Sequence, residues 1–505
     1  MTRDSAAPRQ APSPPGAASR PLATEAARAH TGGPAAAAGS DNDADAGRTD
    51  GGSGLRRGLR NRQMSMIAIG GVVGAGLFVG SGTVIRSTGP AALVSYAIAG
   101  LLVILVMRML AELAVADPST GSFAHYASRE FGSWCGLAIG WLYAYSWWVT
   151  VGLEAVIGGE LAHHLVPAVP AWVASLVLLA VLTASNLIHV AAFGEAEYWF
   201  ALIKVVAITA FIGLGVLAVA GLLPGTDPPG TANLLGHGGF APEGWYAVLP
   251  SVLTVIFAFG GAEVVTIAAG EAPRPAEAVR KAIRSTTARI LIFYIGSIGV
   301  IVTLLPYDRA SVTSSPYSAA LDALGVPQAG RLMDLIVLVA VASCLNSGLY
   351  TASRMLFALA GQREAPRLFA RTNARGVPVP AVLVAAGAGL LTLASKYFAG
   401  TATIFTFLLD STGAVIVLMY LCVAACQIRS RMRAERLGRT PAVRMWAYPW
   451  LSWTVVTALA AVLVLLAFDA TTQRSLFLTL TVTVVAAGVG ALRQRRAGRS
   501  GGGGR

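Results

Sequence analysis

Apolar residues fill most of this chain in runs of about 20 residues, the length that an α-helix needs to cross the hydrocarbon core of a bilayer. Short polar segments separate the runs. The pattern predicts an all-α integral membrane protein with twelve spanning helices, near residues 63–85, 91–115, 136–160, 170–188, 195–221, 246–269, 285–305, 331–360, 378–396, 401–427, 446–468 and 475–492.

Glycine interrupts the first of these runs. Residues 69–82 read IGGVVGAGLFVGSG, although each glycine inside a helix costs roughly 0.5–1 kcal/mol relative to alanine. Close packing of small residues between helices is one explanation. The sixth run has a second interruption, the pair Gly260 and Gly261 in FAFGGAEVVTIAAGE, residues 257–271. If spans one to five and six to ten are repeats, the two interruptions occupy corresponding places.

Interruptions at corresponding places indicate an inverted-repeat secondary transporter, in which discontinuous helices 1 and 6 form the central binding site. Non-helical backbone at this depth persists only where it lines a protein cavity or binds a ligand. Freed amides suit a carboxylate and freed carbonyls suit an ammonium group, so we expect a small zwitterion to bind there. The candidate substrate-binding residues are Gly70, Val73, Gly74, Ala75, Gly76, Phe257, Phe259, Gly260, Gly261 and Glu263.

Arginine and lysine gather in alternate loops. A cytoplasmic amino terminus puts all of the rich clusters on the cytoplasmic side, in agreement with the positive-inside rule. The clusters fall within residues 56–62, 274–289, 363–375, 429–444 and 493–499. An even number of spans with both termini in the cytoplasm follows.

The composition agrees with a membrane protein, since 55% of the 505 residues are hydrophobic, 12% are charged and the mean hydropathy is +0.64. The net charge of +13 comes from the loop clusters rather than from a nucleic-acid-binding face, so no nucleic-acid partner is expected. The four cysteines lie in apolar segments without neighbouring histidines. Neither a metal nor another cofactor is expected.

The same features divide the chain into four parts. Residues 1–54 contain no continuous apolar run, which predicts a disordered cytoplasmic tail. Residues 55–428 are predicted to form the transporter core, with repeats at about 63–221 and 246–427. Residues 429–492 add two further spanning helices, and residues 493–505 form a basic cytoplasmic tail.

Several segments resemble a known family: GAGLFVGSG (74–82), MRMLAELAVADPSTGSFAHYA (107–127), GWLYAYSWWVTVGLEA (140–155), ASCLNSGLYTASRML (342–356) and RMWAYPWLSW (444–453). They resemble the amino-acid permeases of the amino acid, polyamine and organocation (APC) superfamily, most closely the γ-aminobutyrate (GABA) permeases. The resemblance implies a leucine-transporter-like fold of five-plus-five inverted repeats with two further helices. It also implies amino-acid uptake by proton symport with alternating access, in a bacterial-type inner membrane. Many relatives have Ser or Thr in place of Ala75, and this difference favours an ω-amino acid.

Ionisable residues inside the spans need a partner or a use, because each costs roughly 2.5–3.5 kcal/mol near a helix centre. Lys204 lies near the middle of span five, and we expect it to be a proton-coupling residue, with a structural salt bridge as the alternative. In some superfamily members a lysine on this span occupies the place where sodium-coupled relatives bind the cation. Ser347 lies near where a coupling-ion ligand on span eight would be, and Asn346 is a weaker candidate.

Two acidic residues carry open alternatives, and a third has a structural explanation. Glu263 follows the second glycine pair and either sets the charge near the substrate amine or braces the unwound segment. Glu154 on span three either contributes to the site or contacts a helix of the scaffold. Glu112 follows Arg108 by four residues, which predicts an ion pair within one helix. One of Phe257 and Phe259 is expected to close over the substrate.

The sequence therefore predicts a transporter, not an enzyme, that binds an amino acid and protons within a lipid bilayer. A permease for an aromatic amino acid, proline or a cationic amino acid is the alternative within the family. An amino-acid sensor on a transporter fold is the alternative from a different class. An ion channel would need amphipathic pore-lining helices or filter loops, which are not evident in the sequence.

Overall fold

A computed structural model describes residues 63, 66, 72–119, 121–188, 190–224, 228–269, 274–326, 328–397, 402–468 and 473–500. Only the backbone is described at 190–192, 265, 269, 275, 282–290, 314, 402–410, 475 and 495–500. All of these residues belong to one compact unit, residues 46–505. The predicted tail 1–54 and the candidate Gly70 lie outside the described residues. Every regular element in the described part is a helix, which confirms the all-α prediction.

Each predicted apolar run coincides with a helix or with a broken pair of helices. The unbroken ones are α4 (Ala92–Ala116), α6 (Ser133–Leu165), α7 (Ala171–Ile188), α8 (Val190–Val219), α12 (Pro275–Leu304), α15 (Ala329–Gly361), α16 (Val379–Tyr397), α17 (Ala402–Arg436), α18 (Trp450–Phe468) and α19 (Gln473–Ser500). The first run contains α2 (Ala75–Phe78) and α3 (Gly80–Thr88), and the sixth contains α10 (Val248–Ala258) and α11 (Val264–Ala269). Eight helical segments of the described part are long and apolar enough to cross a membrane, with α2 to α4 forming one of them.

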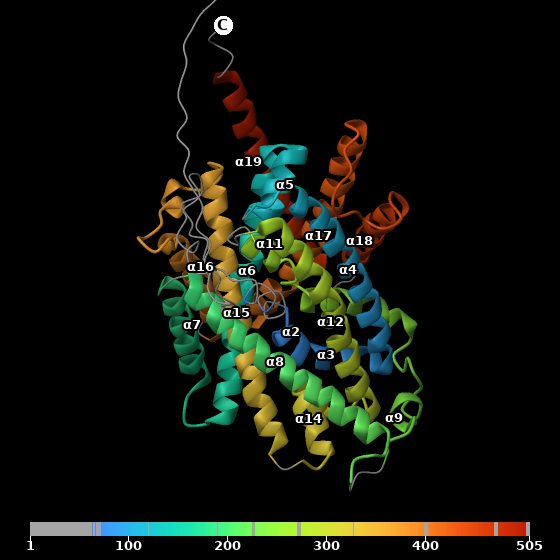
Figure 1. Cartoon of the computed structure of the whole chain (residues 1–505). Helices are drawn as coiled ribbons and strands as arrows, with labels where there is room; N and C mark the ends of the chain where they lie inside the picture. Colours follow the sequence, from blue (N-terminus) through green and yellow to red (C-terminus); the bar gives the residue numbers. More distant parts are fainter. Residues whose placement is uncertain are drawn as a thin grey trace, which may run out of the picture. The chain divides into compact units, whose positions relative to one another are not determined.

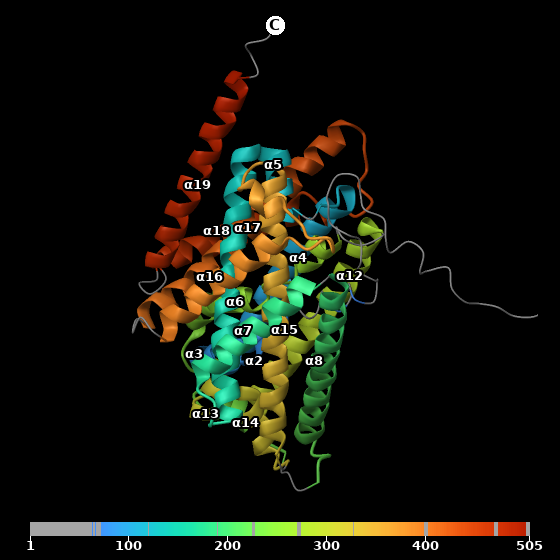
Figure 2. The same ribbon diagram turned by 90° about the vertical axis from the view of Figure 1, so that its left-hand side faces the viewer.

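Four short helices in the connections were not predicted: α5 (Ser122–Phe131), α9 (Ala232–Leu235), α13 (Ala310–Ser314) and α14 (Pro316–Ala323). They are too short to show a run of spanning length, so the search for apolar runs misses them. Helix α5 lies at one end of the bundle, and α13 and α14 lie at the other (Figures 1 and 2).

Helices α6 and α15, each of 33 residues, pack against each other in the middle of the bundle. Glycines on both helices bring the backbones close together. A Cβ atom added to Gly348 would lie 2.9 Å from Val151 Cγ2 and 3.0 Å from a ring carbon of Trp147. The α6–α15 pair therefore forms a close-packed wall against which the broken helices rest.

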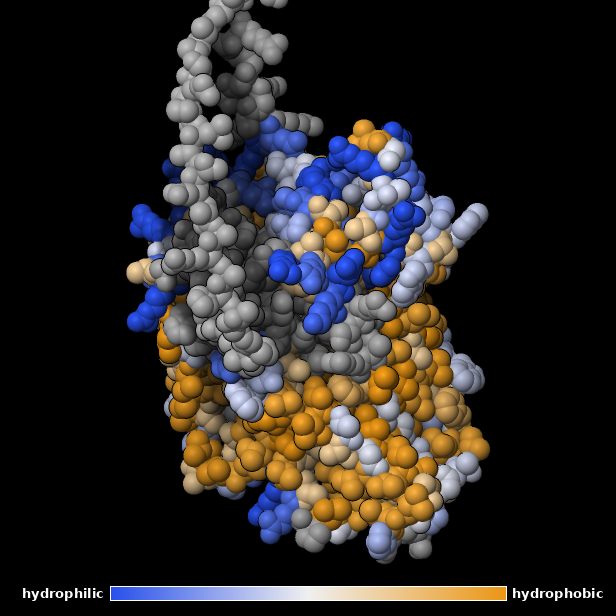
Figure 3. Space-filling view, in the orientation of Figure 1, coloured by the Kyte–Doolittle hydropathy of each residue, from blue (hydrophilic) through white to orange (hydrophobic). Residues whose placement is uncertain are grey.

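The surface is divided into a hydrophobic region and a hydrophilic end. Figure 3 shows hydrophobic residues over the lower part of the molecule and hydrophilic residues gathered at the end where Figure 1 places α5. Large apolar side chains point outward, such as Leu391 on α16 and Val484 on α19, which are 73% and 68% exposed. Exposure of so much apolar surface to water is unfavourable, whereas the acyl chains of lipids cover it. The protein is accordingly a multi-pass membrane protein.

The predicted pair between Arg108 and Glu112 is wrong. Arg108 Nε instead donates to the carbonyl oxygen of Arg444 at 2.9 Å. Glu112 accepts hydrogen bonds from the Met445 amide at 2.7 Å and from Arg431 Nη1 at 3.0 Å. Hydrogen bonds to an ionised carboxylate are stronger than those between neutral groups, so these two partners satisfy the buried Glu112. Glu112 thus fastens α4 to α17 and to the segment before α18.

Candidate functional site

The first run is not helical at Val72, Val73 and Gly74, although Gln63 and Met66 before them are helical. We call residues 72–74 the first break. A Cβ atom on Gly74 would lie 2.8 Å from Cys344 Cβ and 2.8 Å from Glu154 Oε1, so only glycine fits there. The amide of Ala75 donates to the Glu154 carboxylate, at 3.3 Å from Oε1 and 3.4 Å from Oε2. Glu154 therefore holds the start of α2 in place.

The sixth run is not helical from Phe259 to Glu263, and we call residues 259–263 the second break. Gly261 has φ +102°, a conformation that favours glycine. The Glu263 carboxylate accepts hydrogen bonds from the Gly261 amide at 3.1 Å, the Tyr143 hydroxyl at 3.2 Å and the Tyr420 hydroxyl at 3.5 Å. Of the two roles expected for Glu263, the bracing contacts are present: it links its own break to α6 and α17.

The helices that adjoin the two breaks touch at the centre of the bundle. A Cβ atom on Gly76 would lie 2.8 Å from Ala258 Cα, so the backbones of α2 and α10 touch there. The Tyr294 hydroxyl on α12 lies 3.1 Å from the Val72 carbonyl oxygen and 2.7 Å from the Ala258 carbonyl oxygen. Both carbonyls lie where a helix is interrupted, and the fully buried Tyr294 supplies the hydrogen bond that lipid cannot.

Replacing Tyr294 by phenylalanine is expected to slow transport. The change removes the one hydroxyl donor that lies within hydrogen-bond distance of both buried carbonyls, at a cost of about 1–3 kcal/mol, and lets the breaks move apart. We expect initial uptake into proteoliposomes to fall by about tenfold, together with a lower melting temperature of the purified protein.

Tyr317→Phe is the matched control for this change. The Tyr317 hydroxyl is also buried, but it contacts Ser297 Oγ, which can still donate to the Phe293 carbonyl oxygen. Uptake by Tyr317→Phe should stay within about twofold of the unaltered protein. Equal effects of the two changes would show that the link between the breaks has no special role.

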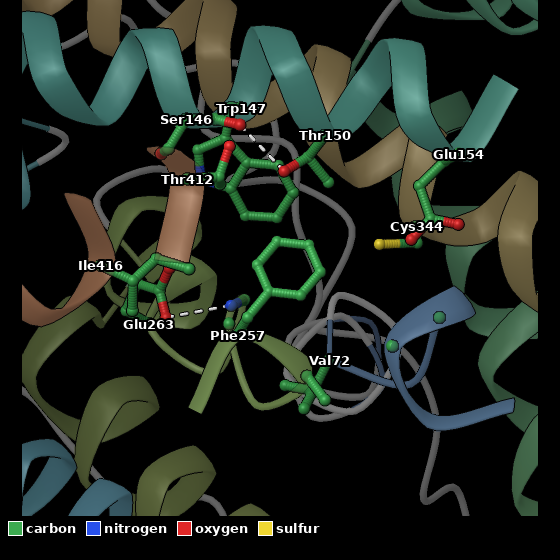
Figure 4. Close-up of a pocket in the computed structure, with 15 residues that line it drawn as sticks. Val72, Ser146, Trp147, Thr150, Glu154, Phe257, Glu263, Cys344, Thr412 and Ile416 are labelled. Atoms are coloured by element: carbon green, nitrogen blue, oxygen red, sulfur yellow. Dashed lines mark hydrogen bonds between the residues drawn. The ribbon is translucent and has the colours of Figure 1, made fainter. Parts of the chain in front are cut away.

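A small central cavity lies between the breaks and α6 (Figure 4). Its volume is about 30 Å³, enough for about one water molecule but not for an amino acid. Gly74, Gly76, Phe257, Gly260, Gly261 and Glu263 are among the residues that line it. The ring of Phe257 lies between Val72 and the α6 residues Trp147 and Thr150 (Figure 4).

A second, larger cavity of about 680 Å³ lies next to the central one, between α3, α10 and α18. Phe257 and Gly76 line both cavities. Phe259 lines neither, because its ring stacks on Tyr294 with the centroids 4.3 Å apart. Phe257 is thus the aromatic residue that separates the two cavities.

Lys204 is fully buried in a polar cluster beside the first break. Its ammonium group interacts electrostatically with the carboxylates of Glu197, also on α8, and Glu154. Glu197 accepts hydrogen bonds from Ser343 Oγ and, at 3.4 Å, from Asn346 Nδ2. Electrostatic interactions therefore extend from Glu154, which holds the Ala75 amide, through Lys204 to Glu197, and hydrogen bonds connect Glu197 to α15.

The structure brings together most, but not all, of the predicted site residues. Val73 is buried away from the central cavity, and Ala75 faces the large cavity instead. Ser347 and Asn346 lie beside Glu197, and Asn346 Nδ2 donates to that carboxylate. No group of three or more His, Cys, Asp or Glu residues within the described part is arranged to hold a metal ion.

The sequence reasoning overlooked two residues that organise this site. Glu197 precedes Lys204 by seven residues, so both lie on one face of α8, and an acidic residue in an apolar run is a detectable signal. Tyr294 gave no comparable signal, because a tyrosine in a transmembrane helix is most often an interfacial or packing residue.

The chain is similar to known proteins over most of its length. The model of the family described as amino acid permease matches residues 63–494. The chain is 46% identical to the gamma-aminobutyric acid permease of Bacillus subtilis, over 85% of this chain and 92% of that protein. It is 45% identical to the probable GABA permease of Pseudomonas aeruginosa, over 88% and 94% of the two chains. It is 37% identical to the aromatic amino acid transport protein AroP of Corynebacterium glutamicum, over 84% and 92%.

Proposed function

The chain belongs to the amino acid permease family, and from this premise we propose that it imports γ-aminobutyrate or a related ω-amino acid by proton symport with alternating access. Its relatives are named permeases, so it is a transporter of amino acids and not an enzyme. In this proposal the chain lies in a bacterial inner membrane with both termini in the cytoplasm, an orientation supported by the arginine-rich loops.

The observation that carries the proposal is the meeting of the two breaks around a central cavity. Their glycines and carbonyls line or border a space that Glu263 also reaches. A zwitterion has one charge for exposed amides and one for exposed carbonyls, so two breaks suit it better than one. We propose that the carboxylate meets the segment from Gly70 to Gly76 and that the amine meets the segment from Phe257 to Gly261.

Packing between the two halves supports a leucine-transporter-like fold of five-plus-five inverted repeats. If residues 63–221 and 246–427 are repeats, then α4 corresponds to α12, α6 to α15 and α7 to α16. Each of these pairs is in contact, and the broken helices also touch at Gly76 and Ala258. Helices near a pseudo-two-fold axis in the membrane plane contact their own counterparts in this way. Helices α18 and α19 then lie outside the repeats.

The size of the cavities supports alternating access. An amino acid does not fit in the central cavity of about 30 Å³, whereas the neighbouring cavity of about 680 Å³ could hold one. We propose that Phe257 swings aside to admit the substrate from the large cavity and then closes behind it. The conformation described here is the one in which Phe257 has closed.

Proton coupling is assigned to Lys204. Glu154 accepts a hydrogen bond from the Ala75 amide and also interacts electrostatically with Lys204. A change in the charge of Lys204 therefore changes how strongly Glu154 holds the first break. When Lys204 loses its proton, the carboxylates of Glu154 and Glu197 lose the positive charge that stabilises them. Protonation and the position of α2 are thereby linked, which is what symport requires.

The experiment that tests this function is uptake into proteoliposomes with an imposed inward proton gradient. Labelled γ-aminobutyrate competes with unlabelled phenylalanine, proline, lysine or β-alanine. We expect gradient-driven accumulation that β-alanine reduces and the other three do not. Strong competition by phenylalanine, proline or lysine would instead favour the alternative permease.

Counterflow separates the remaining classes of protein. A carrier exchanges labelled external substrate for unlabelled internal substrate without a gradient, whereas a channel does not. An amino-acid sensor would bind γ-aminobutyrate without moving it. Binding without either accumulation or counterflow would overturn the transport proposal and leave the family assignment untouched.

A further inference from the structure

A groove of about 500 Å³ lies away from the two breaks, where the C-terminal part of α17 passes the start of α18 and the end of α5. Its apolar wall consists of Phe131, Ala425, Ile428, Met432, Trp453 and Val456. Its polar wall consists of Arg429, Arg433 and Arg436. We call this site the arginine groove.

The three arginines lie on one face of α17, because their spacing of four and three residues returns to the same side of a helix. Arg433 Nη2 lies 3.3 Å from Glu130 Oε2, which accounts for one positive charge. Arg429 lies over the Phe131 ring, 5.1 Å from its centroid. Among the described residues, no carboxylate is within ion-pair distance of Arg429 or Arg436. Two positive charges therefore face the groove.

The apolar wall is accessible at its edge. Trp453 is 55% exposed and Met432 is 42% exposed, although both side chains are largely apolar. Helix α18 begins at Trp450 and is apolar from there onward, so this edge lies where the predicted membrane begins. Tryptophan is enriched at that depth.

We propose that the arginine groove binds a phospholipid with an anionic headgroup, with its phosphate on Arg429 and Arg436 and an acyl chain along Ile428, Met432 and Val456. Charge complementarity determines the sign of the headgroup, and the apolar wall distinguishes a lipid from a free anion. A free phosphate would gain no binding energy from the six apolar residues that line the groove. The bound lipid contacts α5, α17 and α18. Helix α17 also carries Tyr420, whose hydroxyl contacts the Glu263 carboxylate.

The test is a binding titration on the full-length protein in detergent. The probes are dioctanoyl phosphatidylglycerol, dioctanoyl phosphatidylcholine and glycerol 3-phosphate. We expect the protein to bind the phosphatidylglycerol more tightly than the other two. The double variant Arg429→Gln with Arg436→Gln should weaken that binding by about thirtyfold, since each arginine near a headgroup contributes about a factor of five.

The matched control is Arg367→Gln with Arg371→Gln, which removes the same charge from two exposed positions outside the groove. Its affinity for phosphatidylglycerol should stay within about twofold of the unaltered protein. Met432→Trp fills the space along the apolar wall without changing any charge, so it should also weaken phosphatidylglycerol binding. Ala425→Leu replaces it if the tryptophan variant does not fold.

Three outcomes would overturn the proposal. One is equal binding of phosphatidylglycerol and phosphatidylcholine, which would leave the arginines without a role. Another is unchanged affinity in the Arg429 and Arg436 double variant. The third is glycerol 3-phosphate binding as tightly as the lipid with no effect of Met432→Trp or Ala425→Leu, which would indicate a site for a free anion.

Discussion

Substitution of Lys204 by methionine is expected to uncouple transport from the proton gradient. With one proton per substrate, a gradient of one pH unit supports an accumulation ratio of about ten, and the variant should accumulate to a ratio of about one. The reason is that Lys204 is a fully buried cation that interacts electrostatically with Glu154 and Glu197, and methionine has no proton to exchange. Accumulation of labelled γ-aminobutyrate at several imposed gradients measures the effect.

Two companion variants separate proton exchange from the loss of a buried charge. Lys204→Arg keeps the positive charge but stays protonated, so it should lose coupling as Lys204→Met does. Lys396→Met removes the part-exposed lysine of α16, which lies 3.6 Å from Glu160, and should keep full coupling. Counterflow without a gradient serves as the check that each variant is folded. A folded Lys204→Met protein that still follows the gradient would exclude Lys204 as the coupling residue.

Substitution of Gly76 by alanine is expected to slow transport strongly. Alanine favours a helix by about 0.5–1 kcal/mol over glycine, so on local grounds the change should stabilise α2. The new Cβ atom, however, would lie 2.8 Å from Ala258 Cα and 3.0 Å from Ala258 Cβ, and a backbone atom cannot move aside as a side chain can. Overpacking of this kind costs about 1–3 kcal/mol and pushes the two breaks apart, so initial uptake should fall by about tenfold or more.

Gly213→Ala and Gly413→Ala are the matched controls for this prediction. A Cβ atom on Gly213 would meet nothing within 4 Å, and one on Gly413 would only touch Leu253 at 3.9 Å. Both variants should transport at the normal rate, although Gly413 lines the large cavity. Normal uptake by Gly76→Ala would mean that close contact of α2 with α10 is not needed.

The candidate site was only partly predictable, for reasons that particular residues illustrate. Glycine content correctly located both interruptions, because few positions other than a tight contact or a positive φ require that residue, as Gly74 and Gly261 demonstrate. The choice between Phe257 and Phe259 was not predictable. The two rings are two residues apart, and only the packing of Phe259 on Tyr294 shows which of them faces the cavities.

Partners across the bundle were beyond the reach of sequence patterns. Arg108 and Glu112 have the spacing of an intrahelical pair, yet each finds a partner more than 300 residues away. Glu197 carried the same signal as Lys204 but was overlooked, and its hydrogen bonds from α15 could not be inferred from its position. Long-range pairing depends on which helix faces meet, and local spacing does not specify that.

The sequence alone determined that this protein is helical, roughly where its apolar segments lie, and where two of them are interrupted. It could do so because lipid offers the backbone no hydrogen bonds, so each spanning segment must form its own backbone hydrogen bonds as a helix. Where a segment does not, glycines indicate the interruption. Only the tertiary structure decided that the helices next to the two interruptions touch at Gly76 and Ala258, that Tyr294 reaches a carbonyl at each interruption, and that Lys204 interacts with two buried carboxylates. These features depend on the packing of separate helices, where shape and buried polar contacts select one arrangement among many.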